Sequence, residues 1–232
     1  ENAHPHSNAD STISIVHNGI IENFEELKKE LIAKGYNFKS QTDSEVIVHL
    51  IDDYTKKMDF ESAVKATVKR LDGRYAMLAI KAGEHKIIAA RRGSPLIVGI
   101  GENEFFVASD IPAFLEHTRK VMYLDDNQLV VLSTSNKRPH FFDISTGEKI
   151  EKRIIEINLK AEAAEKGEFP YFMIKEIMEQ KDSIYRAINQ HDEEIKKIAE
   201  EIKKAFGTFL IGCGTAGKVC LAAEYIFAKV AK

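Results

Sequence analysis

The chain has 232 residues, of which 44% are hydrophobic and 30% are charged, and its formal net charge is −3 from 33 basic and 36 acidic residues. This composition is typical of a globular protein and argues against a disordered chain. The small net charge and the lack of an apolar run long enough to cross a bilayer give no reason to expect nucleic acid or a membrane as a partner.

The first part of the chain reads as a short strand followed by three helices. The strand is expected from Thr12 to His17, where β-branched residues are frequent. Asn23 and Glu26 have the spacing of a helix cap, and Thr42 to Glu45, "TDSE", has the spacing of a capping box. A third helix is expected from about Phe60 to Leu71, on its pattern of apolar residues.

From Arg74 to about Ile157 the pattern changes to short β-rich runs separated by turns. The runs are "RYAMLAIKA", "HKIIAARR", "LIVGIG", "EFFVASD", "VMYL", "QLVVLS", "HFFDI" and "KRIIEI". Short strands with brief connections form antiparallel sheets. Helices grouped before strands predict an α+β fold rather than a wound parallel sheet.

The last third predicts a second domain. "KAEAAEKGEFP", which ends at Pro170, reads as a connector, and helices are expected through Ala187 and from Asp192 to Ala205. A strand "TFLIG", a glycine-rich turn "GCGTAG" and a further helix then form one βα unit. Glu1 lies in a polar loop and Lys232 in a helix without a cap, so we expect a piece of a longer polypeptide.

The segment "HNG" at His17, Asn18 and Gly19 is the first candidate site. Asn-Gly is a strong turn signal, so a hairpin is one interpretation. The other is an oxyanion hole, in which the Asn18 carboxamide and the Gly19 N–H stabilise a developing negative charge. A helix cap within four residues, instead of a pairing strand, weakens the hairpin interpretation.

Two further groups of polar residues lie near this segment in the sequence. Asp43 is either an acid favoured by the dipole of its helix or a carboxylate that binds a substrate ammonium group. His4, His6 and His17 could suggest zinc, but no cysteine or acidic cluster accompanies them, so we expect no metal and interpret them as pocket support.

"GCGTAG", from Gly212 to Gly217, matches G-x-G-x-x-G between a strand and a helix. The acidic residue that a dinucleotide site needs about twenty residues later cannot be tested in this chain. Backbone N–H groups at a helix N-terminus bind any phosphate, so a sugar phosphate is an equal candidate. The two cysteines, Cys213 and Cys220, lack metal-like spacing and favour a reducing, cytoplasmic setting.

The motifs "NAHPH", "HNGIIEN", "GYNF", "TDSEV", "RRGSPL", "FVASD" and "KEIMEQ" occur in this order. Together they resemble the isomerising glutamine–fructose-6-phosphate aminotransferases, the glucosamine-6-phosphate synthases, over essentially the whole chain. "HNG" and "TD" are shared with other amidotransferases that have an N-terminal cysteine. "KEIMEQ" followed by the glycine turn is more particular to the synthases.

The resemblance implies an N-terminal-nucleophile hydrolase domain, with two antiparallel sheets between helical layers, which hydrolyses glutamine. Residues 1–160 would form this glutaminase domain, truncated at its N-terminus, with 161–170 as a connector. Residues 171–232 would begin a sugar-isomerase domain that binds fructose 6-phosphate. The family makes glucosamine 6-phosphate, the first step of amino-sugar synthesis, without a cofactor, and its full-length members are commonly homodimers.

Carried onto this sequence, the resemblance makes Asn18 and Gly19 the oxyanion donors. Asp43 would bind the α-ammonium of glutamine, with Gly19 also against the substrate. His17 would help to hold this loop, and His4 and His6 would shape the edge of the pocket.

The resemblance also assigns the glycine turn and shows two departures. Thr215 and the backbone of Gly214 would contact the sugar phosphate. Glu1 stands where the family has its nucleophilic cysteine, so this chain alone is expected to be inactive. Ala216 replaces a common serine and removes one phosphate contact.

Two other interpretations remain open. One is an amidotransferase that acts on phosphoribosyl pyrophosphate, which shares "HNG" but not the continuation through "KEIMEQ". The other is a non-catalytic relative that binds a sugar phosphate, which the absent cysteine favours. The upstream coding sequence separates them, because Met-Cys-Gly at its start supports the enzyme.

Overall fold

The computed structural model describes residues 2–135, 138–157, 167, 169–189, 192–212 and 214–230. The chain divides into two compact units, Glu1–Glu165 and Lys166–Lys232. The division falls within the expected connector at 161–170, of which 161–166 and 168 lie outside the described residues, as does Glu1.

The described part of the first unit contains three α-helices and two antiparallel sheets. The helices are α1 (Phe24–Ala33), α2 (Glu45–Thr55) and α3 (Phe60–Arg70). The larger sheet has the order β1-β2-β3-β4-β8-β9-β10, formed by His6–Ser7, Ile13–Ile21, Gly73–Lys81, Lys86–Arg92, Gln128–Ser133, His140–Asp143 and Lys149–Ile150. The smaller sheet has the order β11-β7-β5-β6, formed by Ile155–Glu156, Lys120–Tyr123, Ile97–Ile100 and Phe105–Ala108. The expected α+β class is confirmed.

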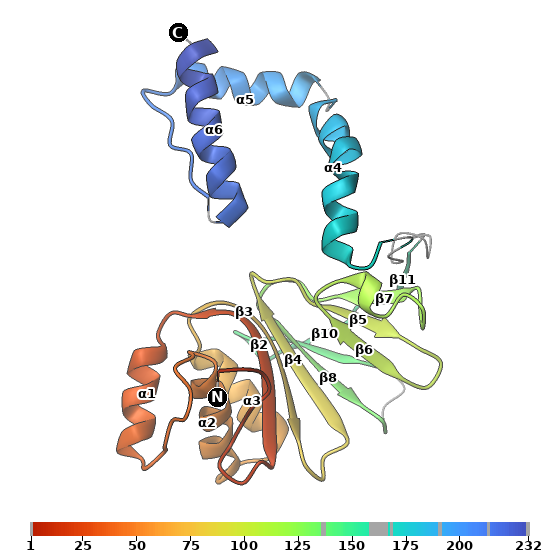
Figure 1. Cartoon of the computed structure of the whole chain (residues 1–232). Coiled ribbons are helices and arrows are strands. Elements are labelled where there is room, and N and C mark those ends of the chain that lie inside the picture. Colours follow the sequence, from red (N-terminus) through yellow and green to blue (C-terminus); the bar gives the residue numbers. More distant parts are fainter. Residues whose placement is uncertain are drawn as a thin grey trace. The chain divides into compact units, whose positions relative to one another are not determined.

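The large sheet lies between the helices and the small sheet (Figure 1). Alternate residues of its strands therefore enter two different cores. Tyr75 and Met77 of β3 pack toward the helices, whereas Ala76 packs toward the small sheet. All six residues of β8 are buried, which explains why "QLVVLS" reads as a continuous apolar run and not as an alternating one.

The outer face of the small sheet carries a third, smaller cluster built on Ile97, Phe114 and Val121. A short 3-10 turn, η1 (Ile111–Ala113), contributes Ile111 to it. In the described part of this unit the second helical layer that the resemblance implies is thus represented by a 3-10 turn.

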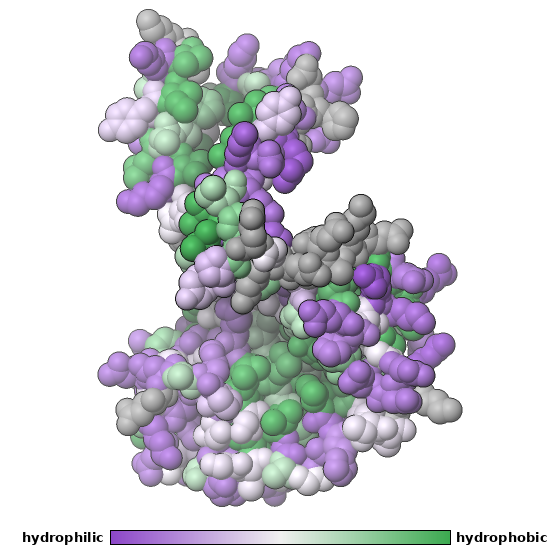
Figure 2. Space-filling model, turned by 45° about the vertical axis from the view of Figure 1, so that its right-hand side comes forward, coloured by the Kyte–Doolittle hydropathy of each residue, from purple (hydrophilic) through white to green (hydrophobic). Residues whose placement is uncertain are grey.

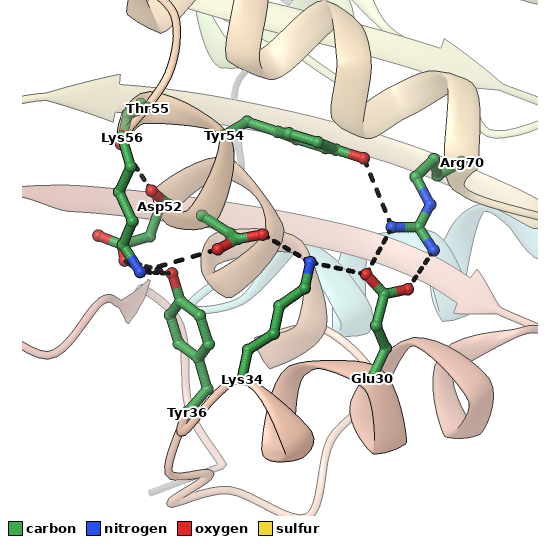
Figure 3. A network of polar contacts seen from close by, with 9 residues as sticks. Glu30, Lys34, Tyr36, Asp52, Tyr54, Thr55, Lys56 and Arg70 are labelled. Carbon is green, nitrogen blue, oxygen red and sulfur yellow. Dashed lines mark hydrogen bonds and ion pairs between the residues drawn. The ribbon is translucent and has the colours of Figure 1, made fainter.

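A network of polar contacts joins the three helices (Figure 3). Arg70 of α3 binds Glu30 of α1 through two hydrogen bonds, 2.6 Å from Nη2 to Oε2 and 3.2 Å from Nη1 to Oε1. Lys34, just after α1, donates to Glu30 at 2.8 Å and to Asp53 of α2 at 2.7 Å. Tyr36 donates to Asp52 at 2.7 Å. These bonds fix α1 and the segment after it against α2.

Strand β2 ends four residues later than predicted, because it continues through Asn18 and Gly19 to Ile21 instead of ending at His17. Its register with β3 runs from Ile13 opposite Lys81 to Ile21 opposite Gly73, without an interruption. The hairpin interpretation of Asn-Gly is therefore wrong.

Glycines at two positions permit this pairing. Gly19 and Gly73 have φ of +135° and +122°. A Cβ at Gly19 would lie 2.0 Å from the Arg74 carbonyl oxygen, and a Cβ at Gly73 would lie 2.1 Å from the Ile20 carbonyl oxygen. Side chains at these positions would force the two strands apart.

Helix α1 begins directly after Asn23, as predicted, but neither of the two predicted caps forms its side-chain hydrogen bond. The side chain of Asn23 makes no cap bond; it donates to the Arg70 carbonyl at 2.8 Å and accepts from the Asp72 N–H at 3.1 Å. Helix α2 begins at Glu45, and no side chain caps it. Glu45 accepts from the backbone N–H groups of Lys39 and Ser40 instead of that of Thr42.

The second unit contains α4 (Phe172–Ile188), α5 (Asp192–Lys204) and α6 (Gly214–Val230). None of its described residues is buried. Figure 2 shows apolar side chains on the surface of these helices as well as in a hollow of the sheet unit. The strand predicted at 208–212 is absent, and no described segment of this unit lies beside it as a pairing partner.

Among the described helices, none combines the length and the apolarity needed to cross a bilayer.

Candidate active site at the free edge of β2

The candidate site lies at one edge of the large sheet, where β2 extends beyond its short neighbour β1. The pairing of β1 with β2 consists of Ser7 opposite Ser14 and His6 opposite Ile15. Among the described residues, no strand continues this pairing from Val16 to Ile21. The backbone of β2 is therefore open along this edge.

The hydrogen bonds of β2 show which of its N–H groups point to the open edge. The N–H groups of Ile13 and Ile21 point away from β3, to Asn8 Oδ1 at 2.9 Å and Asp43 Oδ2 at 2.6 Å. The Glu22 N–H points the other way, to the Asp72 carbonyl at 2.8 Å. Because the direction alternates along an antiparallel strand, the Gly19 N–H lies on the same edge as the Ile21 N–H. The Gly19 donor thus lies two residues along β2 from the N–H that binds the Asp43 carboxylate.

Asp43 lies in the turn before α2, two residues before Glu45, the first residue of the helix. It is partly exposed, and the Ile21 N–H occupies one of its oxygens. The carboxylate retains further acceptor positions for a cationic ligand, since it has two oxygens with about four lone-pair sites.

The three predicted histidines gather around the same turn. The buried His17 is hydrogen-bonded through Nδ1 to Ser44 Oγ at 2.8 Å, and the buried His6 through Nε2 to Thr42 Oγ1 at 3.2 Å. The exposed His4 packs edge-on against His6, with 5.1 Å between ring centroids. Hydroxyl groups on both sides of Asp43 are thus bound to imidazoles.

Burial lowers the pKa of His17, and the nearby Asp43 carboxylate opposes this effect. Burial also lowers the pKa of His6, with a further contribution from His4. Both rings are therefore neutral at pH 7, which suits side chains that hold a site through hydrogen bonds. No group of three or more His, Cys, Asp or Glu in the described part of the chain is arranged to hold a metal ion.

Asn18 is exposed, and by the alternation of the strand its side chain points to the face opposite His17. The structure brings Asp43, Gly19, His4, His6 and His17 to one edge. Asn18 adjoins them through its backbone, but its carboxamide is not held by a described contact.

Sequence reasoning missed the residues that support this edge: Ser40, Thr42, Ser44, Glu45 and the Ile21 N–H. The signal was present in the dense hydroxyls of "SQTDSE", but it read as a helix cap.

A cavity of about 1130 Å³ in the first unit lies elsewhere. Its lining includes Ser11, Lys81, Lys86, Phe105 and Ser133, and it does not include the candidate residues.

The predicted phosphate site lies in the second unit, at the start of α6. Gly214 is the first residue of the helix, and Thr215 follows it. The turn is tight, because a Cβ at Gly217 would lie 2.6 Å from the Gly212 carbonyl oxygen. A cavity of about 580 Å³ borders Gly212, Gly214 and Gly217. Cys213 lies outside the described residues.

Comparison with known families decides the class of the first unit. Residues 1–116 match the family model of the glutamine amidotransferase domain. The chain belongs to this glutamine amidotransferase family.

Similar curated proteins match this chain over nearly its whole length. A glutamine–fructose-6-phosphate aminotransferase (isomerizing) of Methanothermobacter thermautotrophicus is 42% identical over 98% of this chain and 38% of its own length. The protein of the same name from Thermococcus kodakarensis is 44% identical over all of this chain and 38% of its own length. The chain thus spans about two fifths of these relatives.

Solved structures show the same fold. Glutamine phosphoribosylpyrophosphate amidotransferase of Bacillus subtilis, complexed with ADP and GMP, superimposes with a TM-score of 0.54 at 24% identity. The match covers 63% of this chain and 32% of that one. At this identity the likeness establishes the amidotransferase fold with its antiparallel sheets and helices, and nothing finer.

Proposed function

We propose that the chain is part of an isomerising glutamine–fructose-6-phosphate aminotransferase, in which the unit Glu1–Glu165 binds glutamine and stabilises the transition state of its hydrolysis. The observation that carries this proposal is the free edge of β2. There the Gly19 N–H lies on the same edge as the Ile21 N–H, two residues further along β2, which binds the Asp43 carboxylate.

The two groups match the two ends of glutamine. Asp43 binds the α-ammonium through the acceptor positions that Ile21 leaves free. When a thiolate attacks the side-chain carbonyl, the carbonyl oxygen becomes an oxyanion. The Gly19 N–H and the Asn18 carboxamide donate to it, and each such donor lowers the barrier by about 3 kcal/mol.

In this proposal the nucleophile is not one of the residues of the unit Glu1–Glu165. The family's chemistry uses an N-terminal cysteine thiolate, with its own amine as the base. Both cysteines of this sequence, Cys213 and Cys220, belong to the unit Lys166–Lys232. Residues of Glu1–Glu165 therefore supply substrate binding and charge stabilisation in this proposal, and not the thiolate.

In the proposal, the unit Lys166–Lys232 belongs to a sugar-isomerase domain. The N–H groups at the start of α6, around Gly214 and Thr215, bind the phosphate of fructose 6-phosphate. The curated aminotransferases match the chain through this unit, at 42% and 44% identity. This favours fructose 6-phosphate over phosphoribosyl pyrophosphate as the acceptor. An assay of the complete gene product that measures ammonia transfer to fructose 6-phosphate and to phosphoribosyl pyrophosphate compares the two acceptors directly.

A pair of variants of the complete gene product tests the assignment in the first unit. Asn18→Ala is expected to lower kcat for glutamate release about a hundredfold with little change in KM for glutamine, because an oxyanion donor acts only in the transition state. Asp43→Asn is expected to raise KM. Asn103→Ala, in the exposed loop between β5 and β6, is the control. A normal kcat in Asn18→Ala would show that this carboxamide is no donor.

A further inference from the structure

Glu45, the first residue of α2, has an unusual environment for a glutamate. It is only 4% exposed, and its carboxylate accepts several hydrogen bonds at once. Oε2 accepts from the Ser40 N–H at 2.6 Å, from Ser40 Oγ at 2.6 Å and from the Lys39 N–H at 3.1 Å. Oε1 accepts from the Lys39 N–H at 2.9 Å and lies 3.3 Å from His49 Nε2.

These bonds keep the carboxylate charged inside the protein. Burial acts to raise the pKa of Glu45, but the hydrogen bonds from the Ser40 hydroxyl and from the backbone of Lys39 and Ser40 outweigh it and lower this pKa. Burial lowers the pKa of the adjacent His49, although Glu45 opposes this effect. Hydrogen bonds to a charged acceptor are stronger than neutral ones, so the carboxylate holds the backbone of Lys39 and Ser40 firmly.

Ser40 connects Glu45 to the candidate site. The Ser40 hydroxyl, which donates to Glu45, lies 3.0 Å from Thr42 Oγ1, and Thr42 Oγ1 lies 3.2 Å from His6 Nε2. The segment 39–44 is thus tied to Glu45 at its start and to His6 in its middle. Asp43 follows Thr42 in this segment, so its carboxylate has little freedom to move away from the β2 edge.

A capping box would not explain this arrangement. In such a box the glutamate reaches back to the N–H of the cap residue three positions earlier. Glu45 instead passes over Thr42 and binds residues five and six positions earlier, which closes the segment 39–44 into a loop with Asp43 near its end.

We propose that Glu45 is a positioning residue for glutamine binding: its buried carboxylate clamps the loop 39–44 and so holds Asp43 where it meets the substrate ammonium. This inference rests on the proposed function, because it assigns a role toward the ligand of Asp43. It predicts that loss of the clamp weakens glutamine binding more than it slows the chemical step.

Steady-state glutamate release by the complete gene product tests this. Glu45→Gln keeps the size of the side chain but replaces one acceptor oxygen by an NH2 group, which faces N–H groups that it cannot bind. We expect KM for glutamine to rise about tenfold with kcat within about threefold of the wild type. Ser40→Ala, which removes only the bridging hydroxyl, is expected to raise KM about threefold.

Two further variants make the result interpretable. Glu61→Gln is the matched control, because Glu61 also lies in the first turn of a helix and forms an ion pair with Lys65, at 2.7 Å; its KM should be normal. Asp43→Asn is the reference for loss of the ammonium contact. A purely structural role of Glu45 would lower the active fraction, and with it kcat, at an unchanged KM.

Each outcome decides the inference. A raised KM in Glu45→Gln and Ser40→Ala supports it. If Asp43→Asn raises KM but Glu45→Gln and Ser40→Ala do not, the positioning role is wrong while the proposed function stands. If Asp43→Asn itself leaves KM unchanged, the ammonium assignment fails, and the inference fails with it. If Glu45→Gln does not fold, Ser40→Ala decides by the same criterion.

Discussion

Replacement of Gly19 by alanine tests the unusual pairing at the end of β2. The new Cβ would lie 2.0 Å from the Arg74 carbonyl oxygen, far inside van der Waals contact, at a φ of +135°. The backbone strain alone costs about 1–3 kcal/mol. Separation of β2 from β3 weakens about two ladder hydrogen bonds, at about 1 kcal/mol each. We therefore expect a loss of about 3–5 kcal/mol of unfolding free energy.

Gly35→Ala is the matched control for this change. Gly35 also has a positive φ, +91°, but a Cβ there would meet no atom within 4 Å. Its substitution should cost only the conformational term, about 1–2 kcal/mol. Thermal unfolding of the complete gene product, followed by circular dichroism, compares the two. If Gly19→Ala melts at or above the temperature of Gly35→Ala, the close approach of β2 to β3 is wrong.

Three smaller perturbations test the surroundings of the site by urea unfolding. Hydrogen bonds from Arg70 and Lys34 lower the pKa of Glu30 from 4.5 to about 2, which is about 3.4 kcal/mol at full strength. Because this side chain is 35% exposed, screening leaves about 1 kcal/mol. The stabilisation is present above pH 4.5 and lost as the pH falls to about 2, so Glu30→Gln should be less stable than the wild type at pH 7 and equal to it at pH 2. Asn23→Ala removes both bonds to the backbone of Arg70 and Asp72, where α3 ends and β3 follows, and should cost about 1–2 kcal/mol; an unchanged stability would contradict those bonds. Because burial lowers the pKa of His17, its neutral form stabilises the fold above pH 6.5 and this stability is lost below it. His17→Gln should therefore lose less stability than the wild type between pH 7 and 5.5, and an equal loss would contradict the burial effect.

Most strands between Arg74 and Ile157 could be predicted, because their turn residues and β-rich runs are local signals. The extension of β2 could not be predicted, because it depends on residues that are far apart in the sequence. The strands can pair only if glycine stands both at position 19, against the Arg74 carbonyl, and at position 73, against the Ile20 carbonyl. The prediction of a strand at 208–212 is wrong for a related reason, since a strand needs a pairing partner that the sequence does not reveal.

The site shows the same limit. The motifs "HNG" and "TD" and the histidines pointed to residues that are distant in sequence, and the fold brings Asp43, His6 and His17 together. The cap signals at Asn23 and Glu45 were misleading, because both side chains satisfy backbone groups outside their own helix. A local motif shows that a polar side chain has a partner nearby, but packing decides which partner it binds.

A structure of the complete gene product with glutamine or its product glutamate bound tests the central claim most directly. The account predicts the ligand's ammonium group on the Asp43 carboxylate. It also predicts the reacting side-chain oxygen about 3 Å from the Gly19 nitrogen and from the Asn18 carboxamide. A ligand that lies away from the β2 edge, for example in the cavity lined by Lys81 and Ser133, would contradict it.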